Sequence, residues 1–544
     1  MEHTNNRIGP REYRKEGLHW SQVVAGIVLL KFPDLDTYTV AAGISPSGIV
    51  HFGNFRDVMT SYAVMKTLAM EGKKTRFIFS WDDFDRLRKV PSNVPEDFAK
   101  YVGFPLANIP DPDGREDSYA RKFEIPFEQS AADMNLGLQF IRQSKMYGSG
   151  AYVKEIKFAL QNRDRIGQVL FSHMTEEAKS EKNITEADYI ANYYPITVYS
   201  RFSGRDNTKI ISYDGNSKIK YYCHDTKQED VIDFENDHLA KLAWKIDWPT
   251  RWIFEGVVFE PGGKDHANPG SSYDVGCDFM KNLFYKTAPL FVGYEFIGIR
   301  GLGAKMSGSK GNAVTPADLL EIYDPNLLLW LCMRLMPDTA FQLAFDSEIY
   351  RQYDEYDREC SSLYLGTLNN EKSHALKLAF VKETFKNPIP FRQAVAFGQI
   401  LNWDAVKVKE KLSESGFEYD LGSIEERLVK AKNWLLKYNL EEAIILRTSP
   451  NENFWNTLSE SQKEHIKNLV TVLDENLDSK DLETRLYDIP KNPELDQKQN
   501  APLQREFFKN IYMLLVDRET GPRLATFLTS IDKEQIKKLL LDPS

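Results

Sequence analysis

The feature that most constrains the fold is a strand–turn–helix–strand pattern near the N-terminus. Residues 37–44, TYTVAAGI, form an apolar run that predicts a buried strand. Residues 55–72 carry apolar side chains at helical spacing, and Gly72 is placed to end that helix. Residues 77–81 predict a second buried strand. Because two strands joined through a helix pair in parallel, the pattern predicts an α/β protein with a parallel sheet.

The pattern changes twice further along the chain. Residues 95–180 are predicted to be mainly helical, and residues 193–235 to form short strands, a small β insertion with Asn/Gly and Asp/Gly turns. Beyond about residue 345, glycine is sparse and amphipathic helices dominate, one of them with a predicted capping box from Ser423 to Glu426. We therefore expect an α/β domain over residues 1–345 and an all-α domain over residues 346–544.

The overall charge excludes one class of partner. The 544 residues include 69 Lys and Arg against 79 Asp and Glu, a formal charge of −10. This balance argues against a protein coated in nucleic acid, although it is compatible with a local basic groove. No long apolar run and no signal-peptide core are present, so we expect no membrane span and a cytoplasmic protein. Four scattered cysteines are predicted to be free, mostly buried thiols: Cys223, Cys277, Cys332 and Cys360.

The turn after the first strand is the first candidate for chemistry. Residues 45–54 read SPSGIVHFGN, and in a parallel sheet this turn lies at the edge where ligands bind. The following helix N-terminus favours anions, and Gly48 and Gly53 would let a phosphate approach the backbone. His51 and Asn54 could donate hydrogen bonds to it. Taken alone, the stretch is equally compatible with an ordinary turn.

A second candidate is KMSGSKGN at residues 305–312, where Lys305 and Lys310 flank two serines and a glycine. Two lysines on such a loop could offset charge on a leaving pyrophosphate. The stretch lacks the Walker A pattern. By itself it is also compatible with a solvated, charged loop.

Together the two stretches resemble the HIGH and KMSKS signatures of class I aminoacyl-tRNA synthetases. Five further blocks resemble the class I lysyl-tRNA synthetases in particular, and the resemblance covers residues 15–540: residues 81–91, 241–252, 259–276, 294–312 and 507–528. It implies a Rossmann-type catalytic domain, the β insertion at 193–235 and an α-helical anticodon-binding domain. The implied activity is that of a lysine–tRNA ligase, with ATP and Mg²⁺, L-lysine and tRNA(Lys) as ligands.

The resemblance also implies the site residues. The catalytic set is His51, Asn54, Lys305 and Lys310. The ATP site comprises Pro46, Ser47, Gly48, His51, Gly53, Asn54, Gly262, Gly263, Asp265, Lys305, Met306, Ser307, Ser309 and Lys310, with Asp265 on the ribose. The lysine pocket comprises Gly43, Ser45, Trp244, His266 and Tyr294, whose aromatic walls suit an alkyl stem and an ammonium head. Asp82, Asp83 and Asp85 follow the second strand, and any of them could pair with the ammonium; Asp83 is our candidate.

Three departures from the family pattern stand out. Ile49 and Gly308 occupy positions where the family has a histidine and a serine. Relatives often carry a cysteine zinc ribbon in the insertion, whereas only the adjacent Cys223 and His224 remain here. Because one cysteine and one histidine side by side cannot form a tetrahedral site, we expect no structural zinc and no metal held by protein side chains.

Other functions stay open on the sequence alone. The chain could be a class I synthetase of another specificity, such as glutamate, or a HIGH-type nucleotidyltransferase. It could also be a non-catalytic paralogue that only binds tRNA. A glutamate pocket would need a fixed cation, and a nucleotidyltransferase would have no use for 200 helical residues after the second motif. We expect a monomer.

Overall fold

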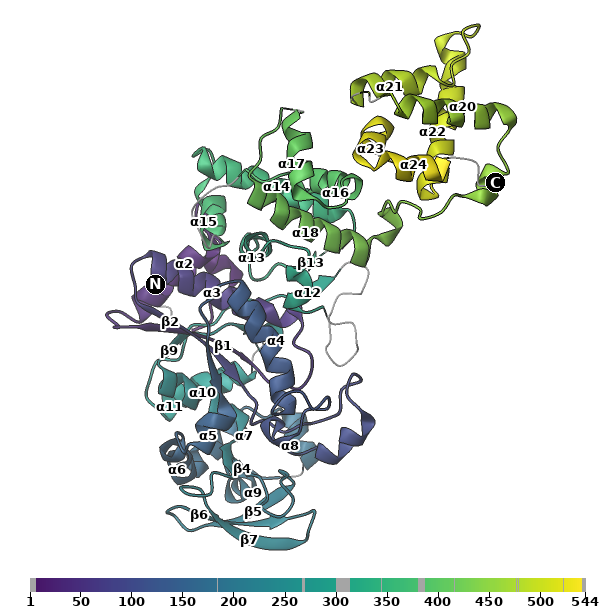
Figure 1. Cartoon of the computed structure of the whole chain (residues 1–544). Coiled ribbons are helices and arrows are strands. Elements are labelled where there is room, and N and C mark those ends of the chain that lie inside the picture. The colour runs from purple at the N-terminus through teal and green to yellow at the C-terminus, as the bar shows by residue number, and fades with distance from the viewer. Residues whose placement is uncertain are drawn as a thin grey trace. The chain divides into compact units, whose positions relative to one another are not determined.

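The computed structural model describes residues 6–182, 184–266, 270–299, 314–343, 345–379, 387–414, 416–475, 477, 479–521 and 523–540. By its contacts the chain divides into two compact units (Figure 1). The first comprises Met1–Ala344 and Ser362–Glu383, and the second comprises Phe345–Ser361 and Thr384–Ser544. Among the described residues, no helix combines the length and apolar character that crossing a membrane requires.

A parallel sheet organises the first unit. Its order is β3-β2-β1-β9, formed by β1 (Tyr38–Ile44), β2 (Thr75–Trp81), β3 (Gln139–Arg142) and β9 (Val257–Phe259). A parallel bridge from Phe259 to Leu290 extends it, followed by the pair β10 (Gly262–Gly263) and β11 (Gly293–Tyr294). The central strand β1 thus has parallel neighbours on both sides, reached by crossovers in opposite directions, which is the Rossmann-type arrangement predicted from the sequence.

Both faces of this sheet are covered. Ala41 and Ile78 pack with Trp252 of α10 (Trp244–Glu255) on one face. On the other face the Phe79 ring lies 4.9 Å from that of Phe127 on α4 (Tyr119–Asp133). Phe127 also contacts Phe55, the first residue of α3 (Phe55–Met70), at 5.1 Å. A strand that is covered on both faces needs apolar side chains on both of them. This explains why the sequences of β1 and β2 are mostly continuous apolar runs.

Helices and short strands complete the first unit. The remaining helices are α1 (Pro10–Tyr13), α2 (Trp20–Lys31), α5 (Gln143–Gly148), α6 (Val153–Gln161), α7 (Arg163–Ser172), α8 (Glu176–Lys182), α9 (Glu186–Asn192), α11 (Ser272–Asn282), α12 (Pro316–Leu320), α13 (Pro325–Met333) and α15 (Asn370–Ala379). Short 3₁₀ turns are η1 (Phe52–Asn54), η2 (Glu96–Tyr101), η3 (Leu106–Asn108) and η4 (Lys264–His266). Two more strands, β12 (Ile297–Ile299) and β13 (Phe341–Leu343), pair in parallel.

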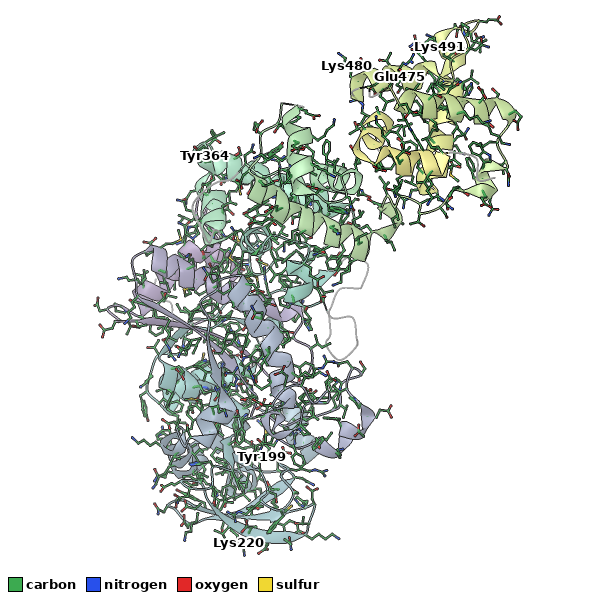
Figure 2. The ribbon with its side chains drawn as sticks, viewed as in Figure 1. Tyr199, Lys220, Tyr364, Glu475, Lys480 and Lys491 are labelled. Carbon is green, nitrogen blue, oxygen red and sulfur yellow. The ribbon has the colours of Figure 1, made fainter. Side chains whose placement is uncertain are left out.

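The expected β insertion is present. β5 (Thr208–Tyr213), β6 (Lys218–Cys223) and β7 (Gln228–Asp233) form an antiparallel sheet, and β4 (Ile196–Val198) pairs with β8 (Ala240–Leu242). The buried Tyr199 hydroxyl donates to the Phe84 carbonyl at 2.7 Å. Lys220 lies on β6 of the antiparallel sheet (Figure 2). The buried Cys223 lies 3.6 Å from the Ser203 hydroxyl. In the described part of the chain, no group of three His, Cys, Asp or Glu side chains could hold a metal ion.

The second unit is helical, as predicted. It contains most of α14 (Glu348–Tyr364), then α16 (Phe391–Ile400), α17 (Ala405–Glu414), α18 (Leu421–Tyr438), α19 (Glu452–Trp455), α20 (Glu460–Leu473), α21 (Ser479–Asp488), α22 (Gln497–Val516), α23 (Leu524–Ser530) and α24 (Lys533–Leu540), with the 3₁₀ turn η6 (Leu440–Glu442).

Two of the predicted local features differ from the structure, and two agree with it. The capping box at Ser423 is wrong, because α18 begins at Leu421 and the side chain of Asp420 accepts from the Ser423 amide. The mainly helical stretch at 95–180 contains β3, a short, half-exposed strand with weak apolar patterning. Gly72 does follow the end of α3, with a positive φ of 77°. All four cysteines are free, three of them buried and Cys277 half-buried, as expected.

Two buried histidines connect the helices behind the sheet. His19 and His374 have ring centroids 5.3 Å apart, and their neighbours are the Met333 carbonyl and the Thr67 hydroxyl, at 2.8 and 3.0 Å from their Nε2 atoms. Burial lowers the pKa of each histidine to about 4. Both side chains are therefore neutral in the folded protein.

This burial predicts a pH dependence of stability. The unfolded chain binds protons at these histidines below a pKa of about 6.5, and the folded chain does not, so the free energy of unfolding falls as pH drops from 6.5 toward 4. In His374→Gln the free energy of unfolding should fall by about 2 kcal/mol less than in the wild type between pH 7 and pH 5. Urea unfolding of both proteins at the two pH values measures this difference. An unchanged pH dependence would contradict the assignment.

Candidate active site

The turn SPSGIVHFGN follows β1 at the carboxyl edge of the sheet and leads through η1 into α3. It is held from several directions. The Tyr119 hydroxyl donates to the Ser47 carbonyl at 2.9 Å. The Asn54 side-chain oxygen accepts from the His51 amide at 3.2 Å. The turn is therefore a fixed element beside a helix N-terminus, an arrangement that favours anions.

The residues on either side of segment 300–313 also contact this turn. The Phe52 amide donates to the Val314 carbonyl at 2.7 Å. The Ile297 carbonyl oxygen lies 3.6 Å from the position that a Cβ on Gly53 would take. Lys305, Met306, Ser307, Ser309 and Lys310 themselves fall outside the described residues, as does the side chain of Asp265.

One cavity of about 410 Å³ runs along the turn. Of the residues predicted to bind ATP, Ser47, Gly48, His51 and Asn54 line it. Ser45, predicted in the lysine pocket, lines this cavity instead, and its hydroxyl donates to the Asp82 carbonyl at 3.4 Å. The other wall comes from the loop after β2 and includes Asp85, Arg86, Arg88, Lys89 and Pro91.

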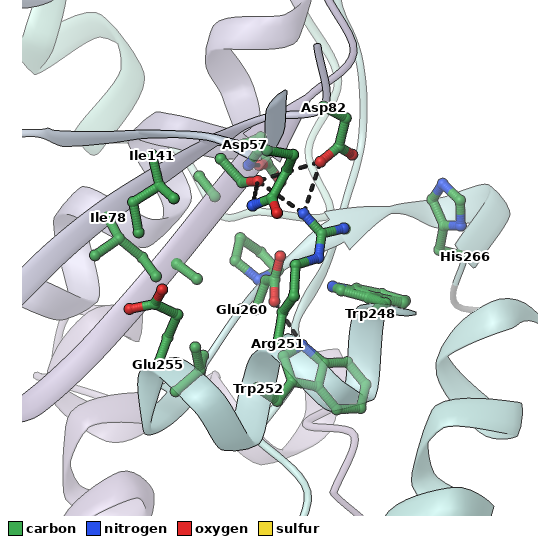
Figure 3. A pocket seen from close by; sticks show the side chains of 18 of the residues that line it. Asp57, Ile78, Asp82, Ile141, Trp248, Arg251, Trp252, Glu255, Glu260 and His266 are labelled. Atoms are coloured by element: carbon green, nitrogen blue, oxygen red, sulfur yellow. Dashed lines mark hydrogen bonds and ion pairs between the residues drawn. The ribbon is translucent and has the colours of Figure 1, made fainter. Parts of the chain in front are cut away.

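A second cavity of about 140 Å³ opens between the strand ends and α10 (Figure 3). Gly43, Trp244, His266 and Tyr294 line it, so four of the residues predicted for the lysine pocket surround one space. Gly262 and Gly263, predicted on the ATP side, line it as well.

Tryptophans of α10 form one wall of this cavity. The rings of Trp244 and Trp248 stack at 5.3 Å, and the Trp248 ring lies edge-on to His266 at 6.3 Å. Trp252, which is 2% exposed, closes the base. Spacing of four residues on one helix places the three rings on one face. Trp248 and Trp252 therefore belong to both the core and the cavity wall, whereas Trp244 lines the cavity and is exposed.

A buried arginine neutralises two of the nearby acids. The Arg251 guanidinium lies 2.6 Å from the Asp82 carboxylate (Figure 3). It also lies 3.5 Å from the carboxylate of Asp247. Its partners hold the pKa of Arg251 well above the ordinary value despite its burial. Asp247 also accepts from the Tyr147 hydroxyl at 2.6 Å. Arg251 is thus committed to protein carboxylates.

Two further carboxylates face the cavity without an ion-pair partner in the described part of the chain, although the charge of Arg251 acts on one of them, Glu260. Asp57, in the first turn of α3, accepts from the Gly43 amide at 3.3 Å and from the Tyr294 hydroxyl. Glu260 accepts from the Trp252 indole at 2.6 Å. Burial raises the pKa of Asp57 well above its usual range, and the nearby Glu260 raises it further. Burial likewise raises the pKa of Glu260. A positive charge placed between the two carboxylates would favour their ionised forms.

The structure separates the three candidate aspartates. Asp83 lines neither cavity; its carboxylate accepts from the Ser144 amide at 2.7 Å and from the Ser144 hydroxyl, at the start of α5. Asp85 pairs with Lys241, and only Asp82 lines the smaller cavity. Our candidate Asp83 is therefore misplaced, because the chain turns after β2 and directs that side chain to α5. Asp57 and Glu260 were missed, since only the fold brings α3 and the end of β9 together.

The Rossmann-type sheet and the turn at its carboxyl edge lie within a stretch of the chain that matches a family model. The family model described as tRNA synthetases class I (K) matches residues 18–382. The chain belongs to this family, and the resemblance predicted from the two motifs is confirmed.

Several curated relatives match almost the whole chain. A lysine–tRNA ligase of Pyrococcus horikoshii is 33% identical over 543 residues, covering 96% of this chain and 100% of the relative. One from Borreliella burgdorferi is 32% identical over 535 residues, covering 96% and 98%, and one from Streptomyces coelicolor is 33% identical, covering 92% and 93%.

Solved structures of other synthetases are more distant. A glutamate tRNA ligase from Elizabethkingia meningosepticum has 12% identity and a TM-score of 0.44, covering 92% of this chain and 98% of its own. A methionyl-tRNA synthetase from Mycobacterium tuberculosis has 12% identity and a TM-score of 0.34, covering 74% and 83%.

The close packing of His51 on Gly53 yields a test of the turn. A Cβ on Gly53 would lie 2.8 Å from His51 Nδ1, so Gly53→Ala must displace the imidazole. We expect Gly53→Ala to slow amino-acid-dependent ATP–pyrophosphate exchange about tenfold or more, and His51→Ala to slow it at least ~10²-fold. The control is Gly26→Ala in α2, where a Cβ meets nothing within 4 Å. Near-normal exchange in both turn variants would show that the imidazole does not act on ATP.

Proposed function

We propose that the protein is a lysine–tRNA ligase. It activates L-lysine with ATP to lysyl-adenylate and transfers lysine to the 3′-terminal adenosine of tRNA(Lys), releasing pyrophosphate and AMP. The observation that carries the proposal is the small cavity, where Asp57 and Glu260 have no ion-pair partner among the described residues and share the space with stacked tryptophans. The relatives that match nearly the full chain are lysine–tRNA ligases, which supports the same activity.

The charge of the cavity favours lysine as the amino acid. An ammonium group placed between Asp57 and Glu260 would stabilise the ionised form of both carboxylates, which burial disfavours. The alkyl stem would pack on Trp244 and Trp248, and Tyr294 would orient Asp57 through its hydroxyl. A glutamate side chain would need a fixed cation, and Arg251 is already held by Asp82 and Asp247. We therefore assign the ammonium to Asp57 and Glu260 in place of Asp83.

The larger cavity would then hold the phosphates. In the first step a lysine carboxylate oxygen bonds to the α-phosphorus of ATP, and pyrophosphate leaves with the bonding electron pair. His51 and Asn54 would donate to the phosphate oxygens, while Ser47 and Gly48 line their path. Lys305 and Lys310 are proposed to offset charge on the leaving group, and Asp265 to bind the ribose. The protein supplies positions and charges, so no protein nucleophile is required.

We propose that Mg²⁺ comes with the ATP phosphates, because the described residues contain no acidic cluster that could hold it.

Residues 1–345 would form the catalytic domain and residues 346–544 the anticodon-binding domain. In the second unit Trp434, Trp455 and Phe507 are buried, whereas Arg523 is exposed and paired with Glu483. Unpaired bases are recognised through stacking and edge contacts with exposed side chains. The three buried aromatic rings are therefore not candidates for contacting the anticodon. A cytoplasmic monomer completes the proposal.

Pyrophosphate exchange with each amino acid in turn tests the activity. We expect ATP-dependent exchange with lysine and with no other amino acid, and charging of tRNA(Lys). Exchange with glutamate would favour the other specificity. No exchange with any amino acid, from protein that still binds tRNA, would favour the non-catalytic paralogue.

Asp57 gives a sharper prediction about specificity. Asp57→Asn keeps the shape but removes the charge, so the KM for lysine should rise roughly 10–100-fold, the scale of a lost charged hydrogen bond. The KM for ATP should change little. Asp83→Asn is the matched control, since Asp83 does not line the cavity and its loss should leave the lysine KM nearly unchanged.

The raised pKa values of Asp57 and Glu260 add a pH signature to this prediction. Lysine binding favours the ionised carboxylates, so it should release protons, and affinity should fall as pH falls through the raised pKa values. Calorimetric titration of lysine in two buffers of different ionisation enthalpy counts the protons released. Equal heats in both buffers, or an unaltered KM in Asp57→Asn, would remove Asp57 from the pocket.

A further inference from the structure

The charged residues along the larger cavity differ in whether they already have partners. Asp85 pairs with Lys241, and Arg86 lies 2.8 Å from Asp206. Arg88 and Lys89 line the same cavity, are exposed, and have no acidic partner among the described residues. Two adjacent cations therefore face the turn without a counter-charge, in a chain whose formal charge is −10.

The chain on both sides of these two cations is anchored. Leu87 is fully buried; its amide donates to the Phe104 carbonyl at 2.8 Å, and its carbonyl accepts from the Gly103 amide at 2.9 Å. Pro91 is buried, and its Cγ lies 3.5 Å from the position of a Cβ on Gly48. Arg88 and Lys89 are thus held on a short bridge whose far end touches the turn itself.

This arrangement places charges of one sign opposite hydrogen-bond donors. The facing wall offers Gly48, His51 and Asn54 beside the N-terminus of α3. A site with donors on one wall and two unpaired cations on the other is complementary to a polyphosphate. The guanidinium suits a two-point contact with phosphate oxygens, and the ammonium acts as a point charge.

We propose that Arg88 and Lys89 bind the β- and γ-phosphates of ATP across the cavity from His51 and Asn54. The inference rests on the proposed function, because it assigns a role within adenylate formation. As the lysine carboxylate oxygen bonds to the α-phosphorus, the bond from that phosphorus to the bridging oxygen breaks. The released pyrophosphate takes the electron pair, and the two cations stabilise its charge.

Exchange in the absence of tRNA tests the assignment. We expect Arg88→Ala and Lys89→Ala each to lower kcat/KM for ATP about tenfold, and the double variant about 10²-fold, with the KM for lysine unchanged. Arg88→Lys should recover part of the loss. The matched control is Lys73→Ala with Lys74→Ala, an exposed adjacent pair that precedes β2 at the opposite edge of the sheet.

Two further measurements separate binding from a structural effect. The KM for ATP should depend less on salt in the double variant than in the wild type, because two screened charges have been removed. Calorimetry with inorganic pyrophosphate should show weaker binding to the double variant and unchanged binding to the lysine-pair control.

The outcomes distinguish this inference from the proposed function. Normal tRNA-free exchange in the double variant would overturn the inference, whereas a wild type that neither exchanges pyrophosphate nor charges tRNA(Lys) would overturn the function itself. A loss confined to tRNA charging would also overturn it and assign the two cations to tRNA phosphates. Because pyrophosphate binding is measured without catalysis, it tests the two side chains in either case.

Discussion

The parallel pairing of β1 with β2 on one side and β9 on the other is the constraint on which the site depends. Parallel strands end at one edge, so the turn after β1, Asp82 after β2 and Glu260 after β9 converge there. The same edge receives the N-terminus of α3. Neither cavity would exist if any one strand ran in the opposite direction.

Arg251 determines how charge is distributed at this edge. Burying a charge is costly unless it is paired, and this guanidinium is shared between Asp82 and Asp247. With those acids neutralised, Asp57 and Glu260 are the carboxylates left for a ligand. The pocket that we propose for lysine would therefore favour a cation although it contains an arginine. The larger cavity shows the reverse pattern: Asp85 is paired, whereas Arg88 and Lys89 have no acidic partner in the part of the chain that the structure describes.

Much of the site could be located from the sequence, because some signals are local. Glycines and a histidine between an apolar run and a helix define the turn wherever the chain folds as βαβ. Trp244 and His266 were predicted for the pocket because they lie in sequence blocks that resemble those of a known family. Asp83 was misplaced because three aspartates in five residues have the same local signature, and only backbone direction separates them. Asp57 gave no signal, since an acid in the first turn of a helix usually serves the helix dipole.

The fold class, the β insertion, the helical C-terminal unit and the family could all be predicted from the sequence, because periodicity and motif spacing are properties of the chain alone. Which of the described acids form ion pairs, and which cavity Arg88 and Lys89 line, depends on the tertiary structure. The physical reason is that an ion pair depends on distances of a few ångströms between segments far apart in sequence. Glu260 and Asp57 become neighbours only when β9 pairs with β1 and α3 begins beside them.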